Sequence, residues 1–186
     1  VPLIIDSDKW VHIEAGILQR SELFNRLFHD IYGPQELIRQ GIIPPEVVFS
    51  HPGFLRPCFG IKQPSAHALI LHGVDLVRTS DDKICVIGDR TQAPSGAGYA
   101  LENRTVMSRV FPSLFRESQV QRLAMFFQTL RVKLNNLSPD DHLPNIVVLT
   151  PGSSSESYFE HAYLANYLGY SLVQGRDLTV RNGHVW

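Results

Sequence analysis

The most informative stretch is Asp89-Arg-Thr-Gln-Ala-Pro-Ser-Gly-Ala-Gly-Tyr-Ala-Leu-Glu-Asn-Arg104. It follows a short apolar run, Ile84 to Ile87, that is typical of a buried strand, and it leads into a helical pattern of apolar residues. Small residues leave its backbone amides uncrowded, and a helix N-terminus favours anions. The stretch therefore predicts either an ordinary strand-to-helix turn or a site for phosphate or carboxylate. Arg90 and Arg104, on either side of the loop, favour the anion site.

The composition is that of a globular protein, with 44% apolar and 19% charged residues among 186. A formal net charge of −1 gives no overall field towards nucleic acid or an anionic membrane. No apolar run reaches membrane-spanning length, and two cysteines are too few for a disulfide framework. We therefore expect a cytoplasmic protein with neither nucleic-acid nor membrane partners. Its oligomeric state is left open.

The order of local patterns predicts an α/β fold. The expected elements are helices 8–32 (capped by Ser7) and 34–39, a helix opening near residue 44, strands 68–77 and 83–89, helices 99–111 and 119–136, strand 146–150, helix 156–168 and strand 170–173. The strands of the hairpin are apolar on both faces, which favours a central position in a larger sheet and a buried Cys85.

The C-terminal part predicts a second structural unit. Strand, Gly/Ser loop, helix and strand over residues 146–173 indicate a βαβ unit, the opening of a doubly wound sheet. Residues 138–144 are the best linker candidate, so we expect one domain over 1–140 and the start of another over 143–186. Asn182-Gly183 predicts a final hairpin whose return strand is short. Together with the non-methionine start, this indicates an excerpt of a longer polypeptide.

The hairpin turn sets which residues face each other. If the turn centres on Asp81-Asp82, Asp75 faces Gly88 and Gly73 faces Arg90. Asp75 and Arg90 then share one surface. An acidic residue in so apolar a strand needs a partner or a metal, so two interpretations stay open: a structural ion pair and a ligand-binding role.

These motifs together resemble a known family. Besides residues 89–104, the matching segments are Ile31-Tyr-Gly-Pro-Gln35, His72-Gly-Val-Asp-Leu-Val-Arg78, Val106-Met-Ser-Arg-Val-Phe-Pro112, Leu149-Thr-Pro-Gly152, Tyr158-Phe-Glu-His-Ala-Tyr-Leu164 and Gln174-Gly-Arg-Asp177. The chain resembles the N-terminal part of circularly permuted ATP-grasp proteins of type 2. The resemblance implies a helical layer with a permuted ATP-grasp hairpin, followed by the start of a Rossmann-like pre-ATP-grasp domain.

The resemblance also implies an activity. Related enzymes of the glutathionylspermidine synthase kind are carboxylate–amine ligases that use ATP and Mg²⁺, and join small or peptide-like carboxylates and amines through an acyl phosphate. Ser95 and Gly96 correspond to the loop that binds the substrate carboxylate in those enzymes, and Arg90 and Arg104, from their own chemistry, are the candidates for ATP phosphate. Asp75 matches the first metal ligand. No catalytic residue is assigned, and this chain alone is expected to be inactive.

One departure from the family pattern raises an alternative. The second pair of metal ligands falls on Gly88 and Arg90, and neither can coordinate a cation. Arg90 can instead contact phosphate directly. The alternative is therefore a binding or scaffold module that kept the fold and lost the metal ligands.

The remaining candidates have ordinary explanations. Ser154 lies before a helix, where it can bind substrate or cap the helix. Glu160 and His161 are expected on the surface of that helix, without a chemical role. The sequence contains no motif of a zinc site, a Walker loop or a nucleophilic triad.

Overall fold

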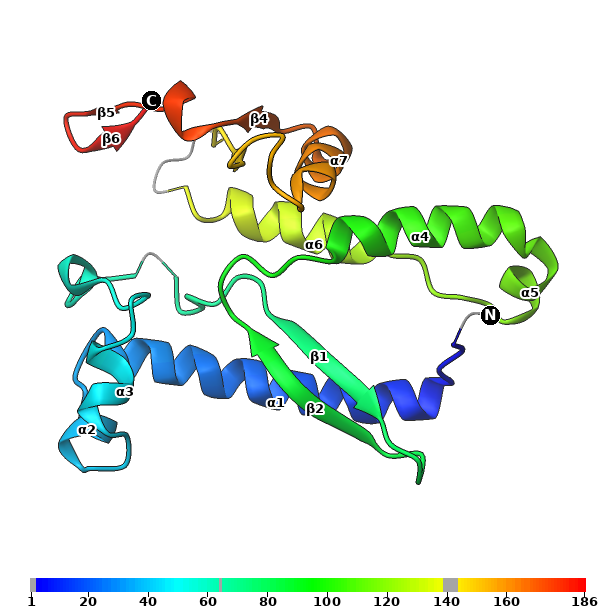
Figure 1. Ribbon diagram of the computed structural model, residues 1–186, viewed down its shortest axis with the longest axis horizontal. Coiled ribbons are helices and arrows are strands. Elements are labelled where there is room, and N and C mark those ends of the chain that lie inside the picture. Colours follow the sequence, from blue (N-terminus) through cyan, green and yellow to red (C-terminus); the bar gives the residue numbers. More distant parts are fainter. Residues whose placement is uncertain (1–2, 64, 139–143) are drawn as a thin grey trace. The chain divides into compact units, whose positions relative to one another are not determined.

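The computed structural model describes residues 3–63, 65–138 and 144–186 (Figure 1). The chain divides into two compact units, Val1–Pro94 and Ser95–Trp186. Among the described residues, no helix combines the length and the apolar character needed to cross a membrane.

The first unit is built on the long helix α1 (Ser7–Ile31). Asp6 caps this helix, because its Oδ1 accepts a hydrogen bond from the Lys9 amide at 2.9 Å. The predicted cap, Ser7, is already helical. Aspartate and serine are equally good caps, so the sequence offered two adjacent candidates. The C-terminal cap is Tyr32, one residue before Gly33, as the pattern predicted.

Short helices follow α1. They are α2 (Glu36–Arg39), α3 (Pro45–Phe49) and the 3-10 turn η1 (Arg56–Cys58). An aromatic cluster joins them to the end of α1. The Tyr32 ring stacks on Phe54 with centroids 5.1 Å apart, and Phe49 packs edge-on against Phe54 at 5.3 Å. The Tyr32 hydroxyl also accepts a hydrogen bond from the Leu55 amide at 3.0 Å. The loop before η1 is thereby fixed to α1.

The hairpin consists of β1 (Gly73–Arg78) and β2 (Ile84–Arg90), which run antiparallel across α1 (Figure 1). Near the turn the register is one residue from the predicted one. A bulge at Ile87 then restores the predicted register, so that Asp75 faces Gly88 and Gly73 faces Arg90. The Lys9 ammonium bonds Asp82 in the turn at 2.7 Å, which ties the far end of the hairpin to the start of α1.

The structure corrects three expectations about this hairpin. Within the described residues it is a two-stranded sheet rather than the centre of a larger one, and Cys85 is exposed. The first strand begins at Gly73 rather than at Ala68. The reason is that side chains of α1 bind the backbone there: Asn25 Oδ1 accepts from the Ala68 amide at 2.9 Å. Residues bonded to a helix side chain are not free to pair with a strand.

The second unit begins with helices α4 (Ala97–Val110), α5 (Pro112–Glu117) and α6 (Ala124–Asn135). Phe127 of α6 is 2% exposed and packs edge-on against the ring of Tyr167, with centroids 5.0 Å apart. This contact joins α6 to α7 (Tyr158–Leu168). Tyr99 of α4 stacks on Phe159 of α7 at 5.6 Å. Helix α7 therefore packs against both α4 and α6.

Strands β3 (Val147–Leu149) and β4 (Ser171–Val173) flank α7 and pair in parallel, which confirms the predicted βαβ connection. A Rossmann-like domain beyond this single unit stays a prediction. The predicted boundary between 140 and 143, and most of the predicted linker, lie outside the described residues. The chain continues through η2 (Gly175–Asp177) into the predicted hairpin of β5 (Val180–Arg181) and β6 (His184–Val185), turned at Asn182-Gly183 with positive φ at both.

Candidate functional site

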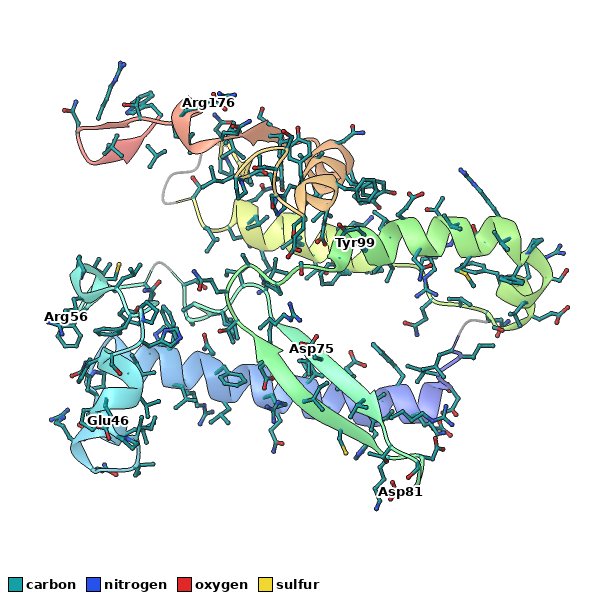
Figure 2. The ribbon with its side chains drawn as sticks, in the orientation of Figure 1. Glu46, Arg56, Asp75, Asp81, Tyr99 and Arg176 are labelled. Atoms are coloured by element: carbon teal, nitrogen blue, oxygen red, sulfur yellow. The ribbon has the colours of Figure 1, made fainter. Side chains whose placement is uncertain are left out.

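The outer face of the hairpin carries the predicted ion pair. Arg90 Nε donates to Asp75 Oδ2 at 3.0 Å, and both side chains are about half exposed. Figure 2 shows Asp75 on β1. Gly88 lies opposite, and a Cβ atom built there would lie 3.3 Å from Asp75 Oδ2. The predicted ion pair of Asp75 and Arg90 is confirmed, and a ligand-binding role of Asp75 stays a prediction. The guanidinium has further N–H donors besides Nε, so Arg90 can still bind a ligand while it is paired with Asp75.

The same contacts test whether the hairpin fits a magnesium ion. Magnesium requires near-octahedral oxygen coordination, usually with one or two carboxylates. Asp75 has one carboxylate, which already accepts a hydrogen bond from the Arg90 guanidinium, while Gly88 has no side chain. Across residues 3–63, 65–138 and 144–186, no three His, Cys, Asp or Glu side chains gather as a metal group. The hairpin residues therefore do not fit the ion.

The inner face of the hairpin carries a network that sequence reasoning missed. Arg20 of α1 donates two hydrogen bonds to the Asp89 carboxylate, and the one from Nε to Oδ1 is 3.0 Å long. His72 Nε2 lies 3.0 Å from the same Oδ1, and the other ring nitrogen lies 2.7 Å from Ser21 Oγ. The side chains of Asp89 and His72 are 12% and 5% exposed. The first residue of the central motif is thus bound inside the protein.

These bonds set the charge of the carboxyl group. The hydrogen bond from Arg20 is the main cause that lowers the pKa of Asp89, and the bond from His72 adds to it against the opposing effect of burial. The hydrogen bond to Asp89 in turn raises the pKa of Arg20. Asp89 is therefore a fixed anion whose partners are two cationic or hydrogen-bonding side chains of its own unit.

Ser21, His72 and Asp89 are ordered like a hydroxyl–imidazole–carboxylate relay. Ser21 lies in the middle of α1, however, and its Oγ is also 2.9 Å from the carbonyl oxygen of Ile17. The carboxylate that would orient the imidazole is held by Arg20. The arrangement therefore has a structural role: it joins α1 to the end of β2. No local motif could have revealed it, because it joins residues 51 and 69 positions apart.

The small-residue loop continues into the second unit, where it does bind an anion. Glu160 Oε1 accepts hydrogen bonds from the amides of Gly96, at 2.7 Å, and of Gly98, at 2.9 Å. Gly96 is the N-cap residue of α4, with a φ of 121° that favours glycine. Glycine has no side chain that could cap α4. The carboxylate of Glu160 therefore takes the place that the sequence assigned to an external carboxylate.

Glu160 corrects an expectation, because it was predicted on the helix surface and is 2% exposed. A Cβ atom at Gly98 would lie 2.8 Å from Glu160 Cγ and 3.2 Å from Leu164 Cγ, so only glycine lets α4 approach α7 this closely. Tyr99, at the start of α4, stacks beside this contact on α7 (Figure 2). Within the described residues, Glu160 Oε2 is buried without a hydrogen-bond partner.

The other predicted site residues of this unit keep open positions. Ser95 and Ser154 are exposed, and Arg104 is half-buried on α4. Next to Arg104, Glu102 lies near Tyr163: burial is the main cause that raises the pKa of Tyr163, followed by the bond to Glu102. Ligand binding by Ser95, Arg104 and Ser154 stays a prediction.

The ends of the parallel strands form a second polar cluster. Thr150, which is buried, follows β3, and its Oγ1 lies 3.0 Å from His161 Nδ1. The Gly152 amide donates to the same Oγ1 at 3.2 Å. Ser154 comes from the loop that this network fixes. Carboxyl ends of parallel strands are the usual binding edge of α/β sheets, which keeps Ser154 a candidate, and its binding role stays a prediction.

Comparison with known proteins decides the family. The family model described as circularly permuted ATP-grasp type 2 matches residues 2–186. The chain belongs to this family. Its relatives include the uncharacterised protein Rv2567 of Mycobacterium tuberculosis, 43% identical over all of this chain and 21% of that protein.

Other relatives are similar at comparable levels. The uncharacterised protein sll0335 of Synechocystis is 43% identical over the whole chain and 39% of its own length, and Rv2411c of M. tuberculosis is 38% identical over 34% of its length. The chain thus spans about a fifth to two fifths of the relatives it matches. Membership indicates a fold of the ATP-grasp type.

Proposed function

We propose that the protein containing this chain is an ATP-dependent ligase that joins a carboxylate to an amine. The observation that carries the proposal is the family match over residues 2–186. In the proposed reaction, a carboxylate oxygen attacks the γ-phosphorus of ATP and ADP leaves. The amine nitrogen then attacks the acyl carbon, phosphate leaves with the bonding electrons, and the nitrogen loses a proton.

Arg90 has the main role within the first unit. ATP phosphates carry charge that must be neutralised, and a guanidinium can bind phosphate oxygens in bidentate fashion. Arg90 uses Nε for Asp75, which orients the side chain on the exposed face of the hairpin. We assign to Arg90 the contact with phosphate that a metal ligand makes in related enzymes. No step is assigned to a metal at this hairpin, because its residues do not fit one.

In the second unit we assign Arg104 to phosphate and the exposed hydroxyl groups of Ser95 and Ser154 to the substrate. The amide of Gly96 donates to Glu160, so a direct bond from that amide to substrate would require Glu160 to leave. Gly96 therefore has a structural role in this proposal: it brings Ser95 to the N-terminus of α4.

Calorimetry of the full-length protein with ATP tests the proposal. We expect binding to weaken at least tenfold in Arg90→Ala, since a charge-assisted pair with phosphate is lost. Arg78→Ala is the matched control, because Arg78 is an exposed guanidinium on the same hairpin that is bound to Asp82. Equal binding by wild type and Arg90→Ala would remove Arg90 from the site.

The same experiment decides between the ligase and the scaffold module. The scaffold interpretation is favoured by two internal pairs, Asp75 with Arg90 and Glu160 with Gly96, which occupy groups that could serve a ligand. A full-length protein that does not bind ATP at all would support the scaffold and contradict the ligase. Phosphate release that requires both a carboxylate and an amine would establish the ligase.

A further inference from the structure

Glu160 supplies the anion that helix α4 needs at its N-terminus. Four amides at a helix N-terminus lack intrahelical partners and carry partial positive charge. Two of them, from Gly96 and Gly98, donate to a single oxygen of Glu160 at 2.7 and 2.9 Å. The carboxylate reaches them from α7, a different helix. The demand of this helix end for an anion is therefore met by the protein itself.

The second oxygen of the same carboxylate has no such partner. Glu160 Oε2 is buried and accepts no hydrogen bond within the described residues. The residue as a whole is only 2% exposed. A buried acceptor without a donor is strongly disfavoured. The helix end offsets only about half an elementary charge, so the carboxylate stays net negative. The group that completes this site is thus a hydrogen-bond donor, and a cationic one fits best.

Two other kinds of ligand fit the geometry poorly. A second anion would have to expel Glu160, whose Cγ packs so closely on Gly98 that even a methyl group would collide with it. A divalent metal ion needs several oxygen ligands, and no group of three metal-binding side chains occurs in the described part of the chain. A protonated amine needs only a few acceptors. One of them, Oε2, is already fixed in place.

We propose that Glu160 Oε2 is the acceptor for a protonated primary amine, bound at the N-terminus of α4. Ser95 is exposed and Gly96 is half-buried, so the surface loop directly before α4 is the entry side. This assignment rests on the proposed function, in which an amine is the second substrate: the amine binds in its protonated form and has to lose one proton before its nitrogen attacks the acyl carbon. The ligand then has the opposite charge to the one expected from the loop. The amides bind the protein's own carboxylate, and that carboxylate binds the cationic ligand.

The test is thermal unfolding of the full-length protein in the presence of propylammonium chloride, at constant ionic strength. A ligand that binds the folded state raises Tm in a saturable way. Tetramethylammonium is the control probe, since it has the same charge and no N–H group. Glu160→Gln removes the charge with little change of shape, and Glu156→Gln makes the same change at an exposed position nearby.

We expect propylammonium to raise Tm in the wild type and in Glu156→Gln, and tetramethylammonium to have no such effect. In Glu160→Gln the rise should be lost. If Glu160→Gln does not fold, the comparison of the two probes in the wild type decides. An equal rise with both probes, no rise at all, or a rise that survives in Glu160→Gln would overturn the assignment.

Two further outcomes separate this inference from its premise. A Tm rise with sodium propionate that grows in Glu160→Gln would identify an anion site and contradict the amine assignment. ATP binding is measured without any amine. Loss of ATP binding with an intact propylammonium response would therefore reject the ligase and keep the amine site, whereas the reverse pattern would reject only the amine site.

Discussion

Arg20 of α1 and Asp89 at the end of β2 form a two-bond ion pair across 69 positions of sequence. His72 joins the same carboxylate from the segment that precedes β1. The pair fixes the strand immediately before the small-residue loop. Asp89 therefore belongs to the framework of the first unit, and the neighbouring Arg90 faces outwards.

This pair predicts a pH dependence of stability. The pKa of Asp89 is lowered in the folded protein relative to the ordinary value of 3.8, mainly by Arg20. Its contribution to the free energy of unfolding is thus fully present above that ordinary value and is lost as pH falls through the lower folded value. Denaturant unfolding between pH 7 and pH 3 should show a steeper loss for wild type than for Asp89→Asn.

The control for this prediction is Glu46→Gln, which removes an exposed carboxylate of the same unit. It should keep the pH dependence of the wild type. Identical slopes for wild type and Asp89→Asn over the acidic range would show that the ion pair contributes nothing to the pH dependence.

A pair of glycines predicts opposite effects of the same substitution. Gly98→Ala should destabilise the protein by about 1–3 kcal/mol, because the added Cβ would lie 2.8 Å from Glu160 Cγ. Gly16→Ala, inside α1, meets no atom within 4 Å and should stabilise by about 0.5–1 kcal/mol through helix propensity. Urea unfolding measures both. A neutral Gly98→Ala would show that α4 and α7 do not approach as closely as described.

Two adjacent phenylalanines of α6 predict how the second unit is held together. Phe127→Ala should cost about 3–5 kcal/mol, because that ring is 2% exposed and packs on Tyr167. Phe126→Ala should cost clearly less, since Phe126 is 46% exposed. The free energy of unfolding from urea titration compares them. Equal losses would contradict the described orientation of α6.

Local patterns predicted much of the fold, and the reasons are specific. The turn before Lys83 and the alternation of the strands placed Asp75 opposite Gly88, and the structure confirms this pairing. The βαβ order could be predicted from the sequence because a Gly/Ser loop separates an apolar strand from a helix. The predicted start of β1 was wrong, because Asn25, on a helix 43 positions away, binds the backbone of Ala68.

The candidate site was less predictable for the same physical reason. The loop correctly indicated a place for an anion, but the sequence did not show that the anion is internal. A signal did exist: Glu160 is the acidic residue of a helix that is otherwise largely apolar. A charged residue among such neighbours needs a partner, and the partners lie more than sixty positions away. Distances of this kind are set by tertiary packing rather than by local pattern.

The single extra residue at Ile87 has a wider consequence for the two charges that follow it. Ile87 is 71% exposed and bulges out of β2. Successive side chains of a strand alternate, so an unbroken ladder would exchange the destinations of Asp89 and Arg90. Asp89 and Arg90 stay opposite Val74 and Gly73 because Ile87 is left out of the ladder; if Ile87 paired with Asp75 instead, the acid would face solvent and the guanidinium would face α1. The bulge, which leaves Ile87 unpaired, thus determines which of the two charges faces α1 and which faces solvent.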